Sequence, residues 1–270
     1  MNLSYSPIQP QFGVELDPYI QLMDLDDDQI ESLHQLAAER GVVVAREQSM
    51  DVDDQAAFAR RLGETFTNPV HKPGVPEELI VIHANENSRR VAGQGWHSDV
   101  SSEDVPPGLS MLRMEIVPDS GGDTLFADMR QAFDRLSPQM QSFLCSLTAR
   151  HDPKGHYLYI SGAKKLHELP SANHPVVRVH PRTGDRALYV NVGFVGKVVE
   201  LSDRESEALL AMLYDHTAYS VDIQCRVRWQ PNTVVFWDNR IVQHHAAFDY
   251  YPQTRKGYRA TIRGEAPVPA

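Results

Sequence analysis

The chain has 270 residues, of which 41% are hydrophobic and 23% are charged, so it can bury a large core and is unlike a disordered protein. Its net charge of −10, with no cluster of basic residues to offset it, argues against a nucleic-acid-binding protein. Two cysteines are too few for a disulfide framework, and no apolar run reaches the ~18 residues that cross a bilayer. The N-terminus lacks the pattern of a signal peptide. We therefore expect a cytoplasmic protein with no membrane partner.

The first half of the chain is expected to alternate short strands with helices that begin at acidic residues. Residues 1–24 contain three prolines and predict extended structure. Helices are expected over 26–40 and 51–62, because aspartates crowd the first turn and apolar residues recur at helical spacing. Apolar runs predict strands over residues 42–45, 79–83, 109–116 and 124–126.

The second half begins with two predicted helices, over 129–136 and 138–147. Residues 150–174 are polar and carry four histidines, so they are expected to form a lid or insertion. Further elements are a hairpin of strands 176–179 and 187–190, a helix over 202–216, and strands over 223–229, 233–237 and 258–263. Many short strands with inserted helices predict one domain over residues 1–270. We expect a mainly β fold with flanking helices and a double-stranded β-helix (jelly-roll) core.

A metal-binding pattern is carried by His97 and Asp99, which are two residues apart and would share one face of a strand. With one later histidine, they would supply two imidazoles and one carboxylate. This set occupies one face of an octahedral metal and is typical of non-haem Fe(II) oxygenases. His244 and His245 are adjacent, so a regular strand directs only one of them inward, and spacing alone leaves the choice open. The alternative is that His97 is a hydrogen-bonded strand residue without a metal.

Motifs in a characteristic order run through most of the chain. They are Gly95–Asp99, Pro118–Thr124, His174–Pro181, Ser206–Leu210, Arg226–Trp229 and Trp237–Arg240, followed by Gln243, His244, Arg255 and Arg259–Thr261. In these motifs the chain resembles the taurine dioxygenase family of oxygenases that depend on Fe(II) and 2-oxoglutarate (α-ketoglutarate), a family that includes the aryloxyalkanoate dioxygenases.

The resemblance implies roles for the residues at matching positions. His97, Asp99 and His244 would be the ligands of Fe(II), and O2 would be the oxidant. Arg255 would pair with the distal carboxylate of 2-oxoglutarate, and Thr124 would help to hold the same group. A planar guanidinium suits this task because it can form two parallel hydrogen bonds with a carboxylate.

The resemblance also implies a substrate pocket. Arg259 matches an arginine that grips an anionic head group in taurine-type members. Asn68, His71, Tyr157 and Phe194 match pocket positions, although the loop that contains Asn68 and His71 departs from the taurine pattern. The alternative is that His71 and Tyr157 are surface residues of loops, and that the two C-terminal arginines are surface charges paired with acidic residues.

These observations predict a dioxygenase that hydroxylates a small anionic substrate, a sulfonate, sulfate ester or carboxylate, and releases succinate and CO2. One alternative is a tailoring oxygenase that hydroxylates or desaturates a modified amino acid or other carboxylate. Another is a non-catalytic metal-binding jelly-roll protein, which Arg255 and Thr124 argue against because it would need no cosubstrate site. Asp99 argues against a halogenase. The resemblance also implies a homodimer or homotetramer.

Overall fold

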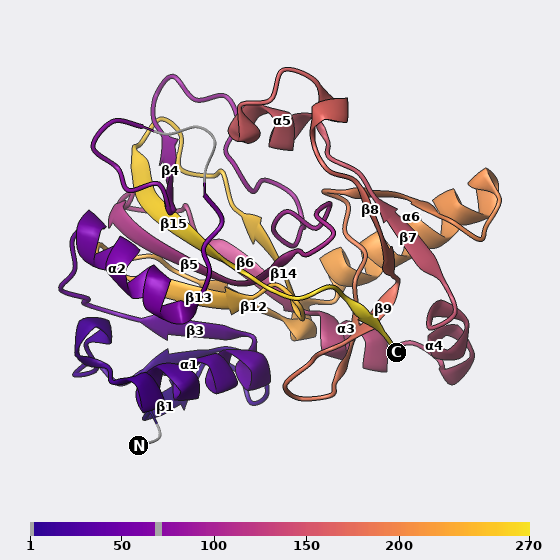
Figure 1. The fold of residues 1–270 in the computed structure, drawn as a ribbon, viewed down its shortest axis with the longest axis horizontal. Coiled ribbons are helices and arrows are strands. Elements are labelled where there is room, and N and C mark those ends of the chain that lie inside the picture. The colour runs from indigo at the N-terminus through magenta and orange to yellow at the C-terminus, as the bar shows by residue number, and fades with distance from the viewer. Residues whose placement is uncertain (1–2, 68–71) are drawn as a thin grey trace.

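The computed structural model describes residues 3–67 and 72–270 as a mixed α/β structure with several sheets (Figure 1). The largest sheet has the strand order β1-β2-β3-β13-β5-β15-β4. Its strands are β1 Tyr5–Pro7, β2 Val14–Leu16, β3 Val42–Ala45, β13 Val234–Asp238, β5 Pro107–Ile116, β15 Arg255–Arg263 and β4 Leu79–Ala84.

Three smaller sheets among the described residues have three strands each. The first consists of β12 Gln224–Val227, β6 Thr124–Asp128 and β14 Val242–Ala246; the second of β11 Val195–Val198, β7 Thr148–His151 and β8 Ala172–Pro175; the third of β10 Arg186–Leu188, β9 Val177–Val179 and β16 Val268–Pro269. The helices are α1 Asp27–Arg40, α2 Val52–Leu62, α3 Met129–Asp134, α4 Pro138–Leu144, α5 Gly155–Ser161 and α6 Asp203–Tyr219, with short 3₁₀ turns at Leu22–Asp24, Leu166–Glu168 and Val221–Ile223.

The large sheet is buried on both faces, because successive residues of β13 pack on opposite sides of it. Val234 and Phe236 pack with the core formed by α1 and α2. Val235 and Trp237 point to the opposite face and pack with residues of the β12-β6-β14 sheet, such as Phe126. The N-terminal helices therefore cover one face of the large sheet, and a second sheet covers the other (Figure 1).

The same alternation directs charged residues of β15 into the space between the sheets. Tyr258, Ala260 and Ile262 belong to the helix-covered core, so the residues between them face the other way. Both Arg255 and Arg259 therefore lie on the face toward the smaller sheet, where they are 4% and 8% exposed. β15 pairs with both β4 and β5, so its register is fixed from two sides.

The predicted N-terminal helices are confirmed, together with their boundaries. The side chain of Asp26 accepts a hydrogen bond from the Gln29 N–H, and the Gln29 side-chain oxygen accepts one from the Asp26 N–H. Gly41 follows α1 with φ of 74°, a conformation that glycine adopts at little cost. None of the helices in residues 3–67 and 72–270 is both long and apolar enough to cross a bilayer.

The prediction that residues 150–174 form one polar lid is wrong at both ends. His151 ends β7 and His174 lies in β8; these two strands pair, and both histidines are buried. Only the middle of the segment, with α5 and the turn at Leu166–Glu168, projects from the sheets, at the upper edge of Figure 1. Polarity was misleading here because the buried imidazoles obtain hydrogen-bond partners from distant parts of the chain.

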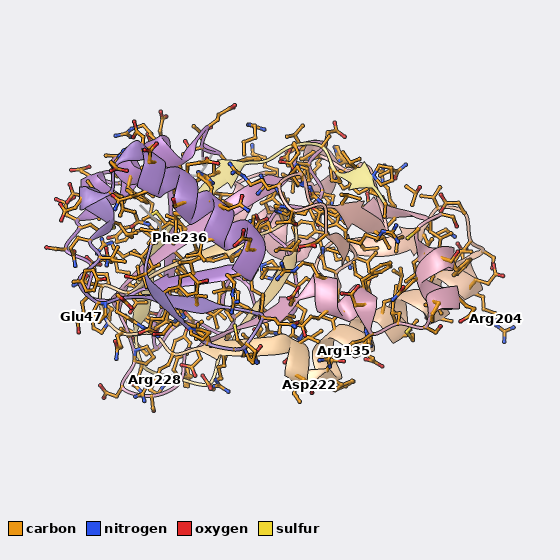
Figure 2. The ribbon with its side chains drawn as sticks, turned by 90° about the horizontal axis from the view of Figure 1, so that it is seen from below. Glu47, Arg135, Arg204, Asp222, Arg228 and Phe236 are labelled. Carbon is orange, nitrogen blue, oxygen red and sulfur yellow. The ribbon has the colours of Figure 1, made fainter. Side chains whose placement is uncertain are left out.

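Surface ion pairs connect elements outside this core. Arg135, which follows α3, pairs with Asp222 just before β12 at 2.7 Å. Figure 2 shows both side chains at the lower edge of that view, away from Phe236 of the core. Such exposed pairs contribute little to stability, so the buried contacts between the sheets determine the fold.

Replacing Gly257 of β15 by alanine is expected to destabilise the protein. A Cβ atom there would lie 2.4 Å from the Arg113 carbonyl oxygen, a backbone atom that cannot move without disturbing β5. We expect a loss of about 1–3 kcal/mol in the free energy of unfolding, measured by urea denaturation. Gly196→Ala is the control, since its Cβ would meet no atom within 4 Å. Equal stability of the two variants would contradict the tight β5–β15 contact.

Candidate active site

Three buried side chains from two distant segments form a potential metal site. His97 and His244 form an isolated bridge in which each backbone N–H donates to the other residue's carbonyl, at 3.1 and 2.8 Å. The Nε2 atoms of the two histidines lie 3.9 and 3.8 Å from Oδ1 of Asp99. One ligand atom from each of the three residues lies within 4.8 Å of the others. The three residues can therefore bind one ion together.

The Asp99 carboxylate is held by neighbours on several elements. Oδ2 accepts a hydrogen bond from Ser110 Oγ of β5 at 2.7 Å, and Oδ1 accepts one from Arg259 Nη1 at 2.6 Å. The Asp99 N–H donates to Asn239 Oδ1. Burial alone would raise the pKa of Asp99, but the positive charge of Arg259, with the two histidines and Ser110, lowers it to about 2. The carboxylate is therefore ionised at neutral pH and can serve as a metal ligand.

Burial favours the neutral imidazole form of both histidines. Burial lowers the pKa of His97, and it lowers the pKa of His244 well below the usual value. His97 Nδ1 donates to the Gly95 carbonyl at 2.9 Å, which leaves the lone pair of Nε2 directed at Asp99. Metal binding requires the deprotonated form of histidine, so no proton has to be removed first.

The structure also decides between the two adjacent histidines. His244 points inward to Asp99, whereas His245 points away. His245 Nδ1 accepts a hydrogen bond from the Gly95 N–H at 3.2 Å, and its ring lies 5.8 Å from the ring of Trp96. The expectation that His97 and Asp99 share one face of a regular strand is wrong, because His97 forms a single bridge and Asp99 begins a turn.

Arg255 is a buried cation without a carboxylate partner among the described residues. Its Nε donates to the Gly122 carbonyl at 3.0 Å, but Nη2 is buried and has no hydrogen-bond partner. Burial lowers the pKa of Arg255, although an arginine remains protonated in proteins. A buried charge without a partner is costly. The position is therefore suited to a bound anion.

Thr124 and Arg255 share one neighbour, Trp229. The indole N–H of Trp229 donates to Thr124 Oγ1 at 3.0 Å, and the Arg255 guanidinium lies 5.6 Å from the centre of the Trp229 ring. In β6, Thr124 is two residues from Phe126, the residue that pairs with His244. The structure thus places the predicted cosubstrate residues together, next to the potential metal site.

Two of the predicted substrate residues border the same site. The rings of Tyr157 in α5 and Phe194 contact each other edge to face, with centroids 5.7 Å apart. Burial raises the pKa of Tyr157 to about 12, with further effects from Glu103, Arg259 and Asp99. The charges of Arg259 and Asp99 therefore reach the Tyr157 hydroxyl. The other two predictions, Asn68 and His71, lie outside the described residues.

Several residues of the site had no predicted role. Ser110 and Asn239 position Asp99, and Trp229 joins Thr124 to Arg255. Asn239 and Trp229 belong to motifs that the sequence analysis noted, but their partners are more than 100 residues away in the chain. The only local signal for Ser110 is a small polar residue in the apolar first half of β5.

Comparisons with known proteins agree with this geometry. Residues 4–261 match the family described as "Taurine catabolism dioxygenase TauD, TfdA family". The "Alpha-ketoglutarate-dependent sulfonate dioxygenase" of Saccharomyces cerevisiae is 39% identical over 99% of this chain and 68% of that protein. The "Alpha-ketoglutarate-dependent sulfate ester dioxygenase" of Pseudomonas putida is 31% identical over 99% of this chain and 92% of that protein. A solved taurine dioxygenase from Burkholderia xenovorans superimposes with a TM-score of 0.86, at 30% identity, and covers 100% of this chain and 93% of that one.

A buried ionic network supports the segment that carries Asn239. Asp238 Oδ2 accepts hydrogen bonds from His180 Nε2 at 3.1 Å and Arg240 Nη1 at 3.0 Å. Arg240 also pairs with Glu265, which in turn pairs with Arg178. Burial opposes ionisation of Asp238, but Arg240 and His180 lower its pKa to about 2. The network ties β13 to β9 and to the C-terminal segment.

Asp238→Asn is expected to lower stability by about 2 kcal/mol at pH 6, with an effect that depends on pH. The folded pKa lies below the unfolded value near 3.9, so the ionised group stabilises the protein above about pH 4 and loses this effect as pH falls toward 2. Urea denaturation at pH 6 and pH 3.5 should show the difference from wild type shrinking at the lower pH. The exposed Asp222→Asn is the control, with little effect at either pH. A difference that is constant with pH would contradict this account.

Proposed function

Because this chain belongs to the TauD, TfdA family of α-ketoglutarate-dependent dioxygenases, we propose that it uses Fe(II) to hydroxylate a small anionic organic substrate, with release of succinate and CO2. The observation that carries this proposal is the buried and uncompensated charge of Arg255 beside the His97, Asp99 and His244 set. A metal-binding protein without turnover would have no use for a second, buried anion site.

His97, Asp99 and His244 are the proposed ligands of Fe(II). Two neutral imidazoles and one carboxylate on one side of the ion fit the donor set that non-haem Fe(II) oxygenases use. When bound, Fe(II) activates O2 for attack on a C–H bond of the substrate as 2-oxoglutarate is oxidatively decarboxylated. The protein's part is to fix the ligand side chains, and the hydrogen bonds of Ser110 and Asn239 do this for Asp99.

Arg255 and Thr124 are the proposed partners of the distal carboxylate of 2-oxoglutarate. The free Nη2 of Arg255 supplies a charge-assisted hydrogen bond, and the Gly122 carbonyl keeps the guanidinium in place. The Trp229 indole already donates to Thr124 Oγ1, so the hydroxyl proton of Thr124 is free to be donated to the carboxylate. These contacts would set how deeply the cosubstrate enters the site.

Arg259 is the proposed partner of the substrate's anionic group. Its Nη1 bonds to Asp99, but its Nε is buried and has no partner. A substrate anion on this guanidinium would thus lie next to a proposed metal ligand. Tyr157 and Phe194 would border the rest of the substrate, as would Asn68 and His71. Sulfonates and sulfate esters are the favoured substrates, since two relatives are named for them; a guanidinium also accepts a carboxylate.

The remaining proposals concern architecture. The facing sheets on either side of the site are those of a jelly-roll core, and residues 1–270 form a single domain around it. The part of the chain that projects, from α5 to the turn at Leu166–Glu168, would cover the bound substrate and exclude water, since Tyr157 of α5 packs on Phe194, whose neighbour Gly193 lies against His97. A homodimer or homotetramer is the proposed assembly.

The direct test is succinate formation from 2-oxoglutarate with Fe(II), ascorbate and air. Taurine, alkylsulfonates, alkyl sulfates, aryloxyacetates and amino acids would form the panel of candidate substrates. Succinate that rises with one compound supports the proposal and identifies the substrate class. His97→Ala and Asp99→Ala should abolish this succinate formation and also the binding of Mn(II), measured by calorimetry. Both variants should keep a cooperative unfolding transition. Turnover in either variant would refute the metal assignment.

The two arginines are expected to have separate kinetic effects. Arg255→Ala should raise the KM for 2-oxoglutarate by roughly tenfold to a hundredfold, because a charge-assisted contact is lost. Arg259→Ala should mainly raise the KM for the prime substrate. Arg263→Ala is the control in the same strand; it pairs with Glu64 at the surface and should leave both values unchanged. Reversed effects would show that the two roles are exchanged.

A further inference from the structure

A short turn, residues 190–195, contacts both segments that carry the potential metal ligands. Gln243, the residue before His244, donates from Nε2 to the Val190 carbonyl at 2.7 Å. On the other side, Gly193 lies so close to His97 that a Cβ atom added to it would be 2.8 Å from the His97 Cβ. The turn therefore packs directly against the backbone and side chains that form the site.

Asn191 is the side chain that shapes this turn. It is 1% exposed, and both ends of its amide are used. Oδ1 accepts a hydrogen bond from the Phe194 N–H at 2.9 Å, which closes the turn, and Nδ2 donates to Ser101 Oγ at 3.1 Å. Ser101 follows Asp99 by two residues. One amide therefore joins the turn to the metal-binding segment.

The hydroxyl of Ser101 extends this connection to β7. It is hydrogen-bonded to His151 Nδ1 at 2.9 Å, and all three side chains, Ser101, His151 and Asn191, are buried. Burial lowers the pKa of His151 well below its usual value, so the ring is neutral and adds no charge to this part of the site. The Ser101 hydroxyl thus bonds to side chains from two other segments, and such buried hydrogen bonds restrict how these segments pack.

The opposite side of the turn contacts α5. Lys154, which immediately precedes α5, donates from Nζ to the carbonyls of Val192 and Val195 at 2.7 and 2.9 Å. The Phe194 ring packs edge to face on Tyr157 of α5. The 190–195 turn is therefore the element that joins α5 to the potential metal site.

We propose that Asn191 is a positioning residue, which fixes Phe194, and through it Tyr157 of α5, relative to the metal-binding side chains. The kinetic part of this inference rests on the proposed function. Asn191 does not touch the substrate itself. It acts by keeping the aromatic wall at the distance from Asp99 and Arg259 that a bound substrate requires, because an aromatic wall that shifts by even about 1 Å loses productive contacts.

The test uses Asn191→Ala, with Ser206→Ala as a matched control. Ser206 is also buried, and its Oγ accepts a hydrogen bond from the Val198 N–H at the other end of β11. Each substitution removes one buried acceptor from one backbone N–H at an end of β11, and Asn191→Ala also removes the hydrogen bond from Nδ2 to Ser101 Oγ. Both variants are expected to lose melting temperature, and Ser206→Ala controls for the loss of a buried acceptor at a distance from the site.

Two measurements distinguish positioning from stability. Amide hydrogen exchange over Gly155–Ser161 should be about tenfold faster in Asn191→Ala and unchanged in Ser206→Ala. The KM for the prime substrate should rise about tenfold in Asn191→Ala, with the KM for 2-oxoglutarate within about twofold of wild type. Ser101→Ala removes the link between Asn191 and the metal-binding segment, together with the contact to His151, but leaves the hydrogen bond between Asn191 and Phe194. It should show the same kinetic pattern with a smaller exchange effect.

The outcomes separate this inference from the proposed function. Unchanged exchange in α5 of Asn191→Ala would overturn the positioning role, whatever the activity. Equal KM changes in Asn191→Ala and Ser206→Ala would overturn it too, because a structural effect would then suffice. If the wild-type protein formed no substrate-stimulated succinate, the proposed function would fail, and hydrogen exchange alone would decide whether Asn191 couples α5 to the site.

Discussion

The carboxylate of Asp99 is a buried negative charge, and much of the site depends on how that charge is compensated. A buried charge is tolerated only with close hydrogen bonds and an opposite charge. Ser110 from β5 and Arg259 from β15 supply them, while Asn239 after β13 accepts a hydrogen bond from the Asp99 N–H and donates to Ser110 Oγ. Three neighbouring strands of the large sheet are thus coupled to one residue. Their register fixes the position of Asp99 relative to His97 of its own segment and to His244 of the facing strand β14.

The two arginines of β15 have contrasting environments. Arg259 is neutralised by Asp99, whereas Arg255 contacts a backbone carbonyl and an aromatic ring and forms no ion pair within residues 3–67 and 72–270. The same strand alternation buries both. A protein that keeps an uncompensated buried cation sacrifices stability for it, and such sites occur where a ligand supplies the missing charge. The contrast in charge compensation separates a proposed substrate site from a proposed cosubstrate site.

Hydrogen bonds from buried amide side chains also fix the geometry of the site. Asn239 contacts Asp99, Gln243 contacts the 190–195 turn, and Asn191 closes that turn and contacts Ser101. An amide carries both donors and an acceptor, so one side chain can join two segments that neither charge nor apolar packing would fix. These residues are uncharged and do not titrate, so the arrangement they impose does not change with pH.

The sequence by itself determined the N-terminal helices, most strands of the large sheet and the identity of His97, Asp99 and Arg255 as candidates, because capping residues, alternation and motif spacing are local properties. Spacing alone left His244 and His245 open, and the family resemblance favoured His244; the tertiary structure shows that His244 faces Asp99 and His245 does not. Only the tertiary structure decided that Arg259 pairs with Asp99 and that His151 and His174 are buried in paired strands. It also revealed Asn191. The physical reason is that these contacts join residues far apart in the chain, from 23 residues for His151 and His174 to 160 residues for Asp99 and Arg259. Local periodicity does not specify which strands become neighbours.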